Sequence, residues 1–297
     1  MVKYLNFWLL VVTIVCLSYG SYGQHGLNYS QFQRLRNSFN NSLSLMDPNG
    51  GAALMGRLQW VGIDGAPQTY QAGGHVGINR LKMTVGVDIK QASIGVVRDR
   101  ELSGYVASAV RLSENDFLGI SLGGGLLMQA GNFSELDMTD PSFRNDTRYN
   151  RGMVSVSTSY FRENHYYIGV SVPRFLLNTR ESDLDYDFRR AYYLTGGALF
   201  RIDDGFHIRP SFVVSHMENM DLGYDVNVLT FFAQKFGVGL GLQNQGNLSG
   251  LLQCNIGDLG IGYGYQFNVG SRTVHQRISN NTHEISLRYR VGGMKML

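Results

Sequence analysis

Apolar residues recur at every second position through most of the chain. The clearest examples of this alternation are the stretches 222–228, 236–242, 261–267 and 285–291. Because successive side chains of a β-strand point to opposite faces, each stretch predicts a strand with one apolar face and one small or polar face. After the N-terminal segment, no stretch approaches the roughly 18 consecutive apolar residues of a membrane-spanning helix. The pattern therefore excludes a helical membrane protein.

Turn-forming clusters such as Ser113–Asp116 and Arg201–Gly205 separate these stretches into short hairpins. They divide the chain into 14 predicted strands: 56–62, 68–78, 81–94, 101–112, 116–130, 149–162, 165–175, 190–202, 206–217, 221–233, 235–244, 248–257, 259–269 and 281–292. An even number of strands of about ten residues brings both ends to the same side and lets the sheet close.

Two architectures fit this pattern: a soluble β-sandwich or β-solenoid, and a transmembrane barrel. A soluble sheet would carry Lys, Glu, Thr and Asp on its outer face, but here the second face is often Gly, Ser or Ala. Aromatic residues cluster at strand ends, which is typical of the girdles at the two membrane interfaces. These clusters are Phe161, Tyr166–Tyr167, Tyr192–Tyr193 and Phe231–Phe232. The sequence therefore favours an all-β fold, a closed antiparallel transmembrane β-barrel of about 14 strands.

The N-terminus predicts a secretory signal peptide over residues 1–23. Lys3 supplies the positive charge, residues 4–19 are apolar, and small residues precede a cleavage site after Gly23, with Gly20 as the alternative. A membrane anchor is the other interpretation, but the apolar run is shorter than the about 20 residues it needs. We expect residues 24–55 to form a periplasmic or plug-like segment and residues 56–297 to form the barrel, in the outer membrane of a Gram-negative bacterium.

Composition removes several other classes of protein. Aromatic residues make up 12% and charged residues only 16% of the 297 residues, which excludes a disordered chain. Two cysteines cannot staple a chain of this length, so a disulfide scaffold is excluded as well. The net charge of +3 without any run of Lys or Arg gives no support for nucleic-acid binding.

The stretch Gln59-Trp-Val-Gly-Ile-Asp-Gly-Ala-Pro-Gln-Thr69 resembles the signature of the PorP/SprF family of type IX secretion system membrane proteins. Companion stretches follow in the family's order: 111–113, Asp140–Phe143, Tyr167–Arg174, Tyr193–Gly197, Ile208–Phe212 and His283–Leu287. The resemblance covers roughly residues 55–292. One departure lies at 40–53, where relatives carry a Leu-Asn-Pro-Ala-Tyr-Ala-Gly-like stretch and this chain keeps only scattered small residues.

The resemblance implies an outer-membrane barrel without known catalytic activity that serves protein secretion and gliding motility. Its implied partners are other components of that apparatus and secreted cargo proteins. Within the signature, partner contact is one interpretation and a structural role the other: Asp64-Gly65 suits a turn, Pro67 ends strand pairing and Trp60 suits a membrane interface. The candidate contact residues are Gln59, Trp60, Gly62, Asp64, Gly65 and Pro67.

Two other functions stay open, a passive porin and an outer-membrane lipid hydrolase. Many inward Arg, Asp and Glu residues would favour the porin, whereas the small-residue face indicates a narrow lumen or one packed by residues 24–55. His165, His207 and His216 are far apart in the sequence, which disfavours the hydrolase. Alternating carboxylates at 183–187 lack the pattern of a calcium loop, so we expect no metal, no cofactor and no small-molecule substrate.

Overall fold

The computed structural model describes residues 29–136, 140, 145–177, 191–217, 221–243, 247–268 and 281–292. The described chain is dominated by β-structure. The strands are β1 Gly51–Leu58, β2 Gln68–Ile78, β3 Met83–Ile94, β4 Val97–Arg111, β5 Asp116–Gly131, β6 Thr147–Arg162, β7 Tyr166–Leu176, β8 Ala191–Ala198, β9 Phe200–Arg201, β10 Phe206–Met217, β11 Gly223–Phe232, β12 Phe236–Gln243, β13 Asn247–Ile256, β14 Leu259–Asn268 and β15 Thr282–Arg290.

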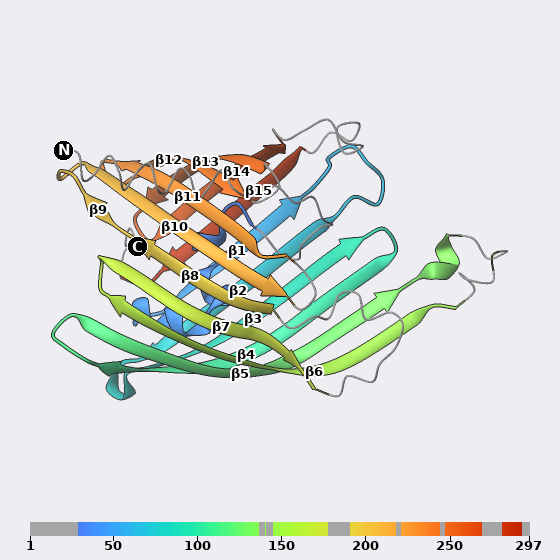
Figure 1. Cartoon of the computed structure of the whole chain (residues 1–297), viewed down its shortest axis with the longest axis horizontal. Coiled ribbons are helices and arrows are strands. Elements are labelled where there is room, and N and C mark those ends of the chain that lie inside the picture. Colours follow the sequence, from blue (N-terminus) through green and yellow to red (C-terminus); the bar gives the residue numbers. More distant parts are fainter. Residues whose placement is uncertain are drawn as a thin grey trace.

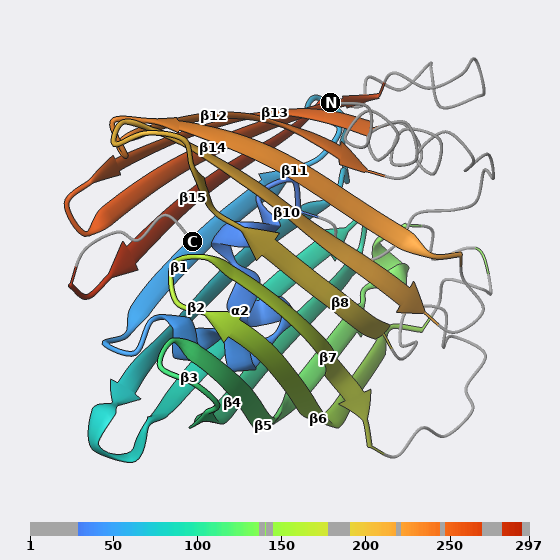
Figure 2. The same cartoon turned by 60° about the vertical axis from the view of Figure 1, so that its left-hand side comes forward.

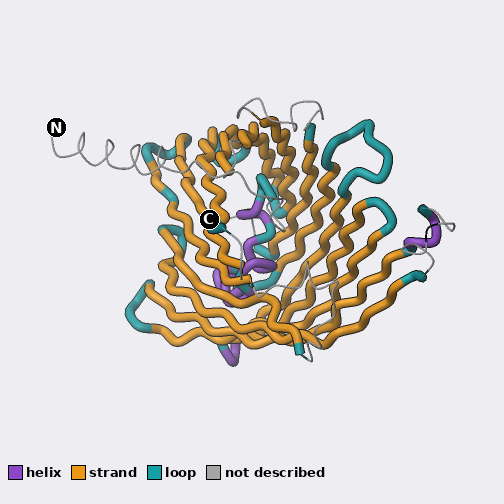
Figure 3. The backbone as a smooth tube through the Cα atoms, turned by 45° about the vertical axis from the view of Figure 1, so that its right-hand side comes forward, coloured by secondary structure: helices purple, strands orange, loops and turns teal. Residues whose placement is uncertain are grey.

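The strands form one closed antiparallel barrel (Figures 1 and 3). Each strand pairs with its neighbour in the sequence, and the last strand returns to the first, with Gly51 opposite Arg290. The two-residue β9 pairs with the start of β10 and continues β8 after a one-residue break, so the barrel has 14 strands when β8 and β9 are counted together. The predicted fold class and strand number are confirmed.

The two faces of the sheet also follow the predicted alternation. Most large apolar residues of the strands are exposed on the outer face. Val238 and Ile261, for example, are 51% and 42% exposed. Their neighbours Gly239 and Gly262 face inward and are buried. Since the outer face of a membrane barrel meets lipid, the exposed apolar side chains form the band that crosses the bilayer.

The strand prediction is wrong at the first strand and, by four residues, at the start of β4. β1 spans Gly51–Leu58 rather than 56–62, so the barrel wall begins five positions before the predicted boundary at residue 56. The alternation is weak there because small residues lie on both faces, Gly51 and Ala53 on the inner face and Ala52 and Gly56 on the outer face. Leu58 is the last strand residue, and the apparent alternation after it belongs to a turn in which Trp60 has a positive φ of 50°.

The aromatic pairs at strand ends do not all belong to interface girdles. In each pair the two rings point to opposite faces, as neighbours on a strand must. Tyr192 and Phe232 are exposed on the outer face, but Tyr193 and Phe231 are 3% and 1% exposed inside the barrel. Phe161 and Tyr167 are also buried inside, so these four rings pack the lumen instead.

The two ends of the barrel differ. The start of β1 and the end of β15 lie at one end together with short connections such as 112–115 and 257–258; we call it the turn end. The other end, the loop end, carries the connections 59–67, 132–146, 177–190 and 269–281. β5 and β6, at 16 residues each, are the longest strands, and their hairpin projects at the loop end with η4 (Phe133–Glu135) at its tip (Figure 1).

Short helical elements lie inside the barrel. They are η1 Phe32–Arg34, α2 Arg36–Phe39 and η2 Asn41–Met46, and the strands surround them (Figures 2 and 3). A further turn, η3 Asn79–Leu81, joins β2 and β3 at the turn end. Within the described residues, no helix is long and apolar enough to cross a membrane.

Candidate functional site

Residues 29–50, which we call the plug, are almost entirely buried in the lumen. Their apolar side chains join two clusters with inward-facing residues of the strands. Toward the loop end, Tyr29, Phe32, Leu35 and Phe39 pack with Met55, Ala191, Tyr193, Val213 and Met217. Toward the turn end, Leu43, Leu45 and Met46 pack with Ala107, Phe161, Tyr167, Leu199, Leu229, Phe231 and Leu251. The plug thus removes apolar surface from water along the height of the barrel.

A carboxylate on β15 holds the start of the plug. The two oxygens of Glu284 accept hydrogen bonds from the backbone N–H groups of Ser30 and Gln31, at 2.9 and 3.0 Å. Arg57 of β1 also donates to this carboxylate, and its other nitrogen donates to Gln266 Oε1 at 3.0 Å. Glu284 is only 1% exposed, so these donors replace the water that a charged carboxylate would otherwise need.

Hydroxyl and amide groups fasten the middle of the plug to the opposite wall. Asn40 donates to the backbone carbonyls of Thr158 and Val170, on β6 and β7, at 3.1 and 3.3 Å. The Ser42 N–H and hydroxyl donate to the hydroxyls of Ser157 and Ser159, at 3.0 and 2.8 Å. The small inner face that the sequence shows on β6 is therefore a row of hydrogen-bonding partners for the plug.

Asp47 joins the end of the plug to β15 near the turn end. This carboxylate is buried and forms ion pairs with three arginines: Arg36 at 3.1 Å, Arg288 at 2.7 Å and Arg290. His75 Nε2 lies 3.1 Å from the Asp47 carbonyl oxygen, and its Nδ1 lies 3.3 Å from the Asn37 amide nitrogen. A carbonyl only accepts, so Nε2 carries the proton and Nδ1 accepts from Asn37.

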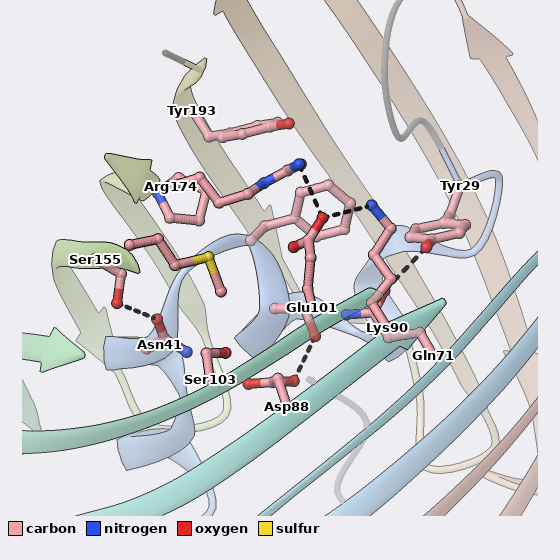
Figure 4. Close-up of a pocket in the computed structure, with 14 residues that line it drawn as sticks. Tyr29, Asn41, Gln71, Asp88, Lys90, Glu101, Ser103, Ser155, Arg174 and Tyr193 are labelled. Atoms are coloured by element: carbon pink, nitrogen blue, oxygen red, sulfur yellow. Dashed lines mark hydrogen bonds and ion pairs between the residues drawn. The ribbon is translucent and has the colours of Figure 1, made fainter. Parts of the chain in front are cut away.

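A small cavity of about 60 Å³ lies beside the plug, lined by Tyr29 and Phe39 and by strand residues of the loop-end half (Figure 4). At its wall, Lys90 and Arg174 converge on Glu101, at 3.1 and 3.0 Å from the same oxygen (Figure 4). Both cations bind the same carboxylate oxygen, and the cavity has room for a few water molecules. It is a gap between the plug and the wall.

A β-bulge brings Arg174 into this cluster. Val172 pairs with Val156, but Phe175 pairs with Val154, so β7 has one residue more than β6 over this interval. The extra residue reverses the alternation. Without it, Arg174 would share the outward direction of Val172 and face lipid; with it, Phe175 faces outward and Arg174 reaches Glu101.

Inward glycines make room for the plug. A Cβ at Gly262 would collide with the side chain of Gln31, one at Gly119 with Leu45 and one at Gly169 with Asn40. By contrast, a Cβ at the outward Gly250 would meet nothing within 4 Å. The glycine content of the inner face is therefore explained in part by the close approach of plug and wall.

The signature residues lie in the β1–β2 connection at the loop end. Gln59 N–H donates to the Pro67 carbonyl at 3.0 Å, which closes the connection, and Pro67 is buried. Gly62 and Gly65 have φ values of 99° and 73°, in the region that favours glycine. The Gly65 carbonyl accepts from the Gly95 N–H of the neighbouring β3–β4 turn at 2.8 Å, whereas Asp64 is exposed. The signature thus forms a part of the loop-end rim in which the β1–β2 connection is hydrogen-bonded to the β3–β4 turn.

The structure does not assemble the other chemistry weighed from the sequence. In the described part of the chain, no histidine ring is hydrogen-bonded to a serine, and no group of three or more His, Cys, Asp or Glu residues could hold a metal ion. The carboxylates at 183–187 lie outside the described residues. The sequence analysis did not identify Asp47, Glu284 and Glu101 as residues that hold the lumen together. The signal for Glu284 and Glu101 was a carboxylate on the inner face of a strand whose outer face is apolar.

Comparison with curated proteins finds no match. Among solved structures, the outer membrane protein Omp33 of Acinetobacter baumannii is 10% identical with a TM-score of 0.47, covering 82% of this chain and 99% of that one. A FadL homologue of Pseudomonas aeruginosa is 9% identical with a TM-score of 0.48, covering 86% and 93%. The monoaromatic hydrocarbon channel CymD is 11% identical with a TM-score of 0.49, covering 91% and 94%. The fold assignment rests on the chain's own strand pairing.

The family that the signature suggested is tested by a comparison with family models. The model described as "Type IX secretion system membrane protein PorP/SprF" matches residues 21–289, which include the plug and all strands except the last residue of β15. The chain therefore belongs to the PorP/SprF family of type IX secretion system membrane proteins, and its closed barrel makes it an outer-membrane component of that system.

Proposed function

We propose that this protein is a plugged, non-conducting barrel that anchors periplasmic components of the type IX apparatus and supports export or surface display of cargo proteins. The observation that carries the proposal is the filled lumen, in which residues 29–50 pack against strands all around the barrel. A barrel closed in this way satisfies its backbone polar groups within lipid. In this proposal, the protein contributes to secretion and to gliding motility through the surfaces at its two rims.

A passive porin is the rival function, and the inward charges are its main support. The lumen does hold Arg, Asp and Glu residues, more than the small-residue face of the sequence indicated. Those at Arg57, Glu284 and Asp47, however, are engaged in ion pairs and hydrogen bonds with the plug or with one another. A conducting pore would instead need such groups to face water along a continuous path.

The absence of catalysis is part of the same proposal. A lipid hydrolase needs a serine activated by a histidine, and His207, buried on the inner face of β10, forms no hydrogen bond to a serine among the described residues. His165 lies in the β6–β7 turn and His216 on the outer face of β10. These three histidines lie at separate places on the wall, so the described residues give the hydrolase no support.

Orientation assigns the rims to the two compartments. Outer-membrane barrels have short periplasmic turns and longer extracellular loops. By this rule the turn end, with Gly51 and Arg290, faces the periplasm, and the loop end faces outside. The signature residues Gln59–Pro67 would then contribute to the surface that meets exported cargo, while the short turns meet periplasmic components.

A deletion strain tests the proposal when export and permeability are measured together. We expect loss of the protein to block secretion or surface display of particular cargo and to leave uptake of small solutes unchanged. The purified full chain in planar bilayers should give no steady single-channel currents. Normal export with reduced solute uptake, together with steady currents, would show that the protein is a channel.

A second variant tests partner contact at the signature. Trp60→Asn with Asp64→Asn removes the ring and the charge while Asn tolerates the positive φ at position 60. The matched control is Leu112→Ala with Glu114→Gln, two exposed residues of the β4–β5 turn at the other rim. We expect the first pair to insert normally and to reduce export, with the control unaffected. If the first pair inserts normally and leaves export intact, the signature has a structural role alone.

A further inference from the structure

Three arginines point outward from the barrel at the loop end of β4 and β6. Arg98 and Arg100 of β4 and Arg148 of β6 are exposed. The strand register places them close together: Arg98 is opposite Ala130 of β5, which is opposite Arg148, and Arg100 is opposite Met128. Because all three share the outward direction of Leu102, they lie on the lipid-facing side of the wall.

These arginines lie at the upper edge of the apolar band. On β5 the outward residues run from Leu118 through Ile120, Leu122 and Leu126 to Met128. Ten residue steps of about 3.4 Å on a strand tilted by about 40° rise about 26 Å, which matches the height of about 25 Å of a barrel's apolar band. The row of Arg100 and Met128 therefore marks the end of the hydrocarbon, and Arg98 and Arg148 lie one step beyond it.

The spacing of the three groups suits a ligand with more than one anionic group. Arg98 and Arg100 are two positions apart on one strand, about 7 Å. Arg98 and Arg148 are separated by the one strand between them, about 10 Å. Each guanidinium can bind a phosphate through two parallel hydrogen bonds, so the patch can hold two phosphates on one headgroup.

In the described part of the chain, no carboxylate forms an ion pair with any of the three. In the loop above, the Asp146 carboxylate accepts the backbone N–H of Ser134 at 3.1 Å, and this hydrogen bond and the charge of Arg148 lower the pKa of Asp146. The outward Arg162 at the turn end differs, because it binds both oxygens of Asp116, at 2.8 and 2.6 Å. The loop-end arginines thus present charge that the wall itself does not neutralise.

We propose that Arg98, Arg100 and Arg148 bind the phosphate groups of a phosphorylated glycolipid in the outer leaflet. The headgroup would lie over the arginines, and its acyl chains would lie along the outward row of Ile89, Leu102 and Leu126 just below. Basic side chains at a membrane surface are attracted electrostatically to anionic lipid headgroups. This interaction goes beyond the export function and follows from the orientation with the loop end outside.

The test uses the full-length protein in neutral detergent and lipid A as the probe. Binding is measured by native mass spectrometry for lipid A with both phosphates, for the same lipid with its phosphates removed, and for inorganic phosphate as a competitor. The variant is Arg98→Gln/Arg100→Gln/Arg148→Gln. The control is Arg80→Gln/Arg201→Gln/Lys235→Gln, which removes the same charge from exposed positions of the turn end.

We expect the wild type and the control to bind phosphorylated lipid A equally, and the loop-end variant to bind it at least tenfold more weakly. The dephosphorylated lipid should bind the wild type at least tenfold more weakly too. Equal binding by the loop-end variant, no preference for the phosphorylated lipid, or displacement by an equal concentration of inorganic phosphate would each overturn the proposal. Heat-modifiable migration on gels reports folding. Should the triple variant not fold, the single variants Arg98→Gln and Arg148→Gln replace it, each expected to weaken binding about threefold.

Discussion

Glu284 and Gln31 hold each other at two points. The backbone N–H of Gln31 donates to the Glu284 carboxylate at 3.0 Å, and the Gln31 side-chain amide donates to the Glu284 carbonyl oxygen at 3.2 Å. The same Gln31 side chain accepts from the Ser286 hydroxyl at 2.9 Å. One plug residue is thereby bonded to the inner face of β15 through its backbone and its side chain.

Replacement of Glu284 by Gln should destabilise both plug and barrel. The change removes the charge that Arg57 faces and one acceptor of the two backbone N–H groups, and breaking a buried pair costs about 3–5 kcal/mol. We expect the free energy of unfolding in lipid vesicles to fall by this amount and the plug to become sensitive to protease. The exposed Glu163→Gln is the control and should change stability by less than about 0.5 kcal/mol. Equal stability of the two variants would contradict the role given to Glu284.

Replacing a glycine by valine should reduce stability on the inner face of the barrel but not on the outer face. Gly262→Val would drive a branched side chain into Gln31 and Ser286, and overpacking of this kind costs about 1–3 kcal/mol. Gly250→Val adds the same atoms to the outer face, where nothing lies within 4 Å, and should be neutral or slightly stabilising. Thermal unfolding of both variants in one detergent measures the difference. A larger loss for Gly250→Val would reverse the assignment of the faces.

A charge on the outer face should be costly because lipid surrounds it. Val238→Arg places a guanidinium in the apolar band, at about 2–4 kcal/mol near the midplane. Val238→Leu keeps the residue apolar and controls for the change of shape. Urea unfolding of both variants in lipid vesicles checks this, with Val238→Leu expected near the wild type. Wild-type stability of Val238→Arg would mean that position 238 does not face the bilayer core.

Loss of the Asp47 charge should leave three arginines without their shared partner. Asp47→Asn keeps the size of the side chain but removes the counter-charge of Arg36, Arg288 and Arg290, at about 3–5 kcal/mol. Adding Arg288→Gln removes one of the unpaired charges, so the double variant should be more stable than Asp47→Asn alone. Thermal unfolding of the two variants provides the comparison. A double variant that is less stable than Asp47→Asn would show that repulsion among these arginines does not dominate.

Local alternation is what the sequence by itself determined about this protein. Because side chains on a strand change face at every residue, runs such as Phe236–Leu242 and Ile261–Phe267 already specified strands with one apolar face. The prediction failed where the alternation was carried by small residues, as at Gly51–Leu58, or by charges above the lipid. β4 begins at Val97, whereas the prediction began at 101. The prediction missed these residues because Arg98 and Arg100 are charged, although their side chains point outward like the apolar residues that follow.

Contacts between distant residues were decided only by the tertiary structure. Nothing local relates Ser30 to Glu284 or Asp47 to Arg288, since these residues are 254 and 241 positions apart and meet only in the closed barrel. The direction of Arg174 likewise depends on one extra residue in the pairing of β7 with β6, which alternation within β7 alone cannot reveal. A period of two specifies the face of each strand residue, but partners across the lumen depend on barrel closure and on what fills it, and both are properties of the assembled fold.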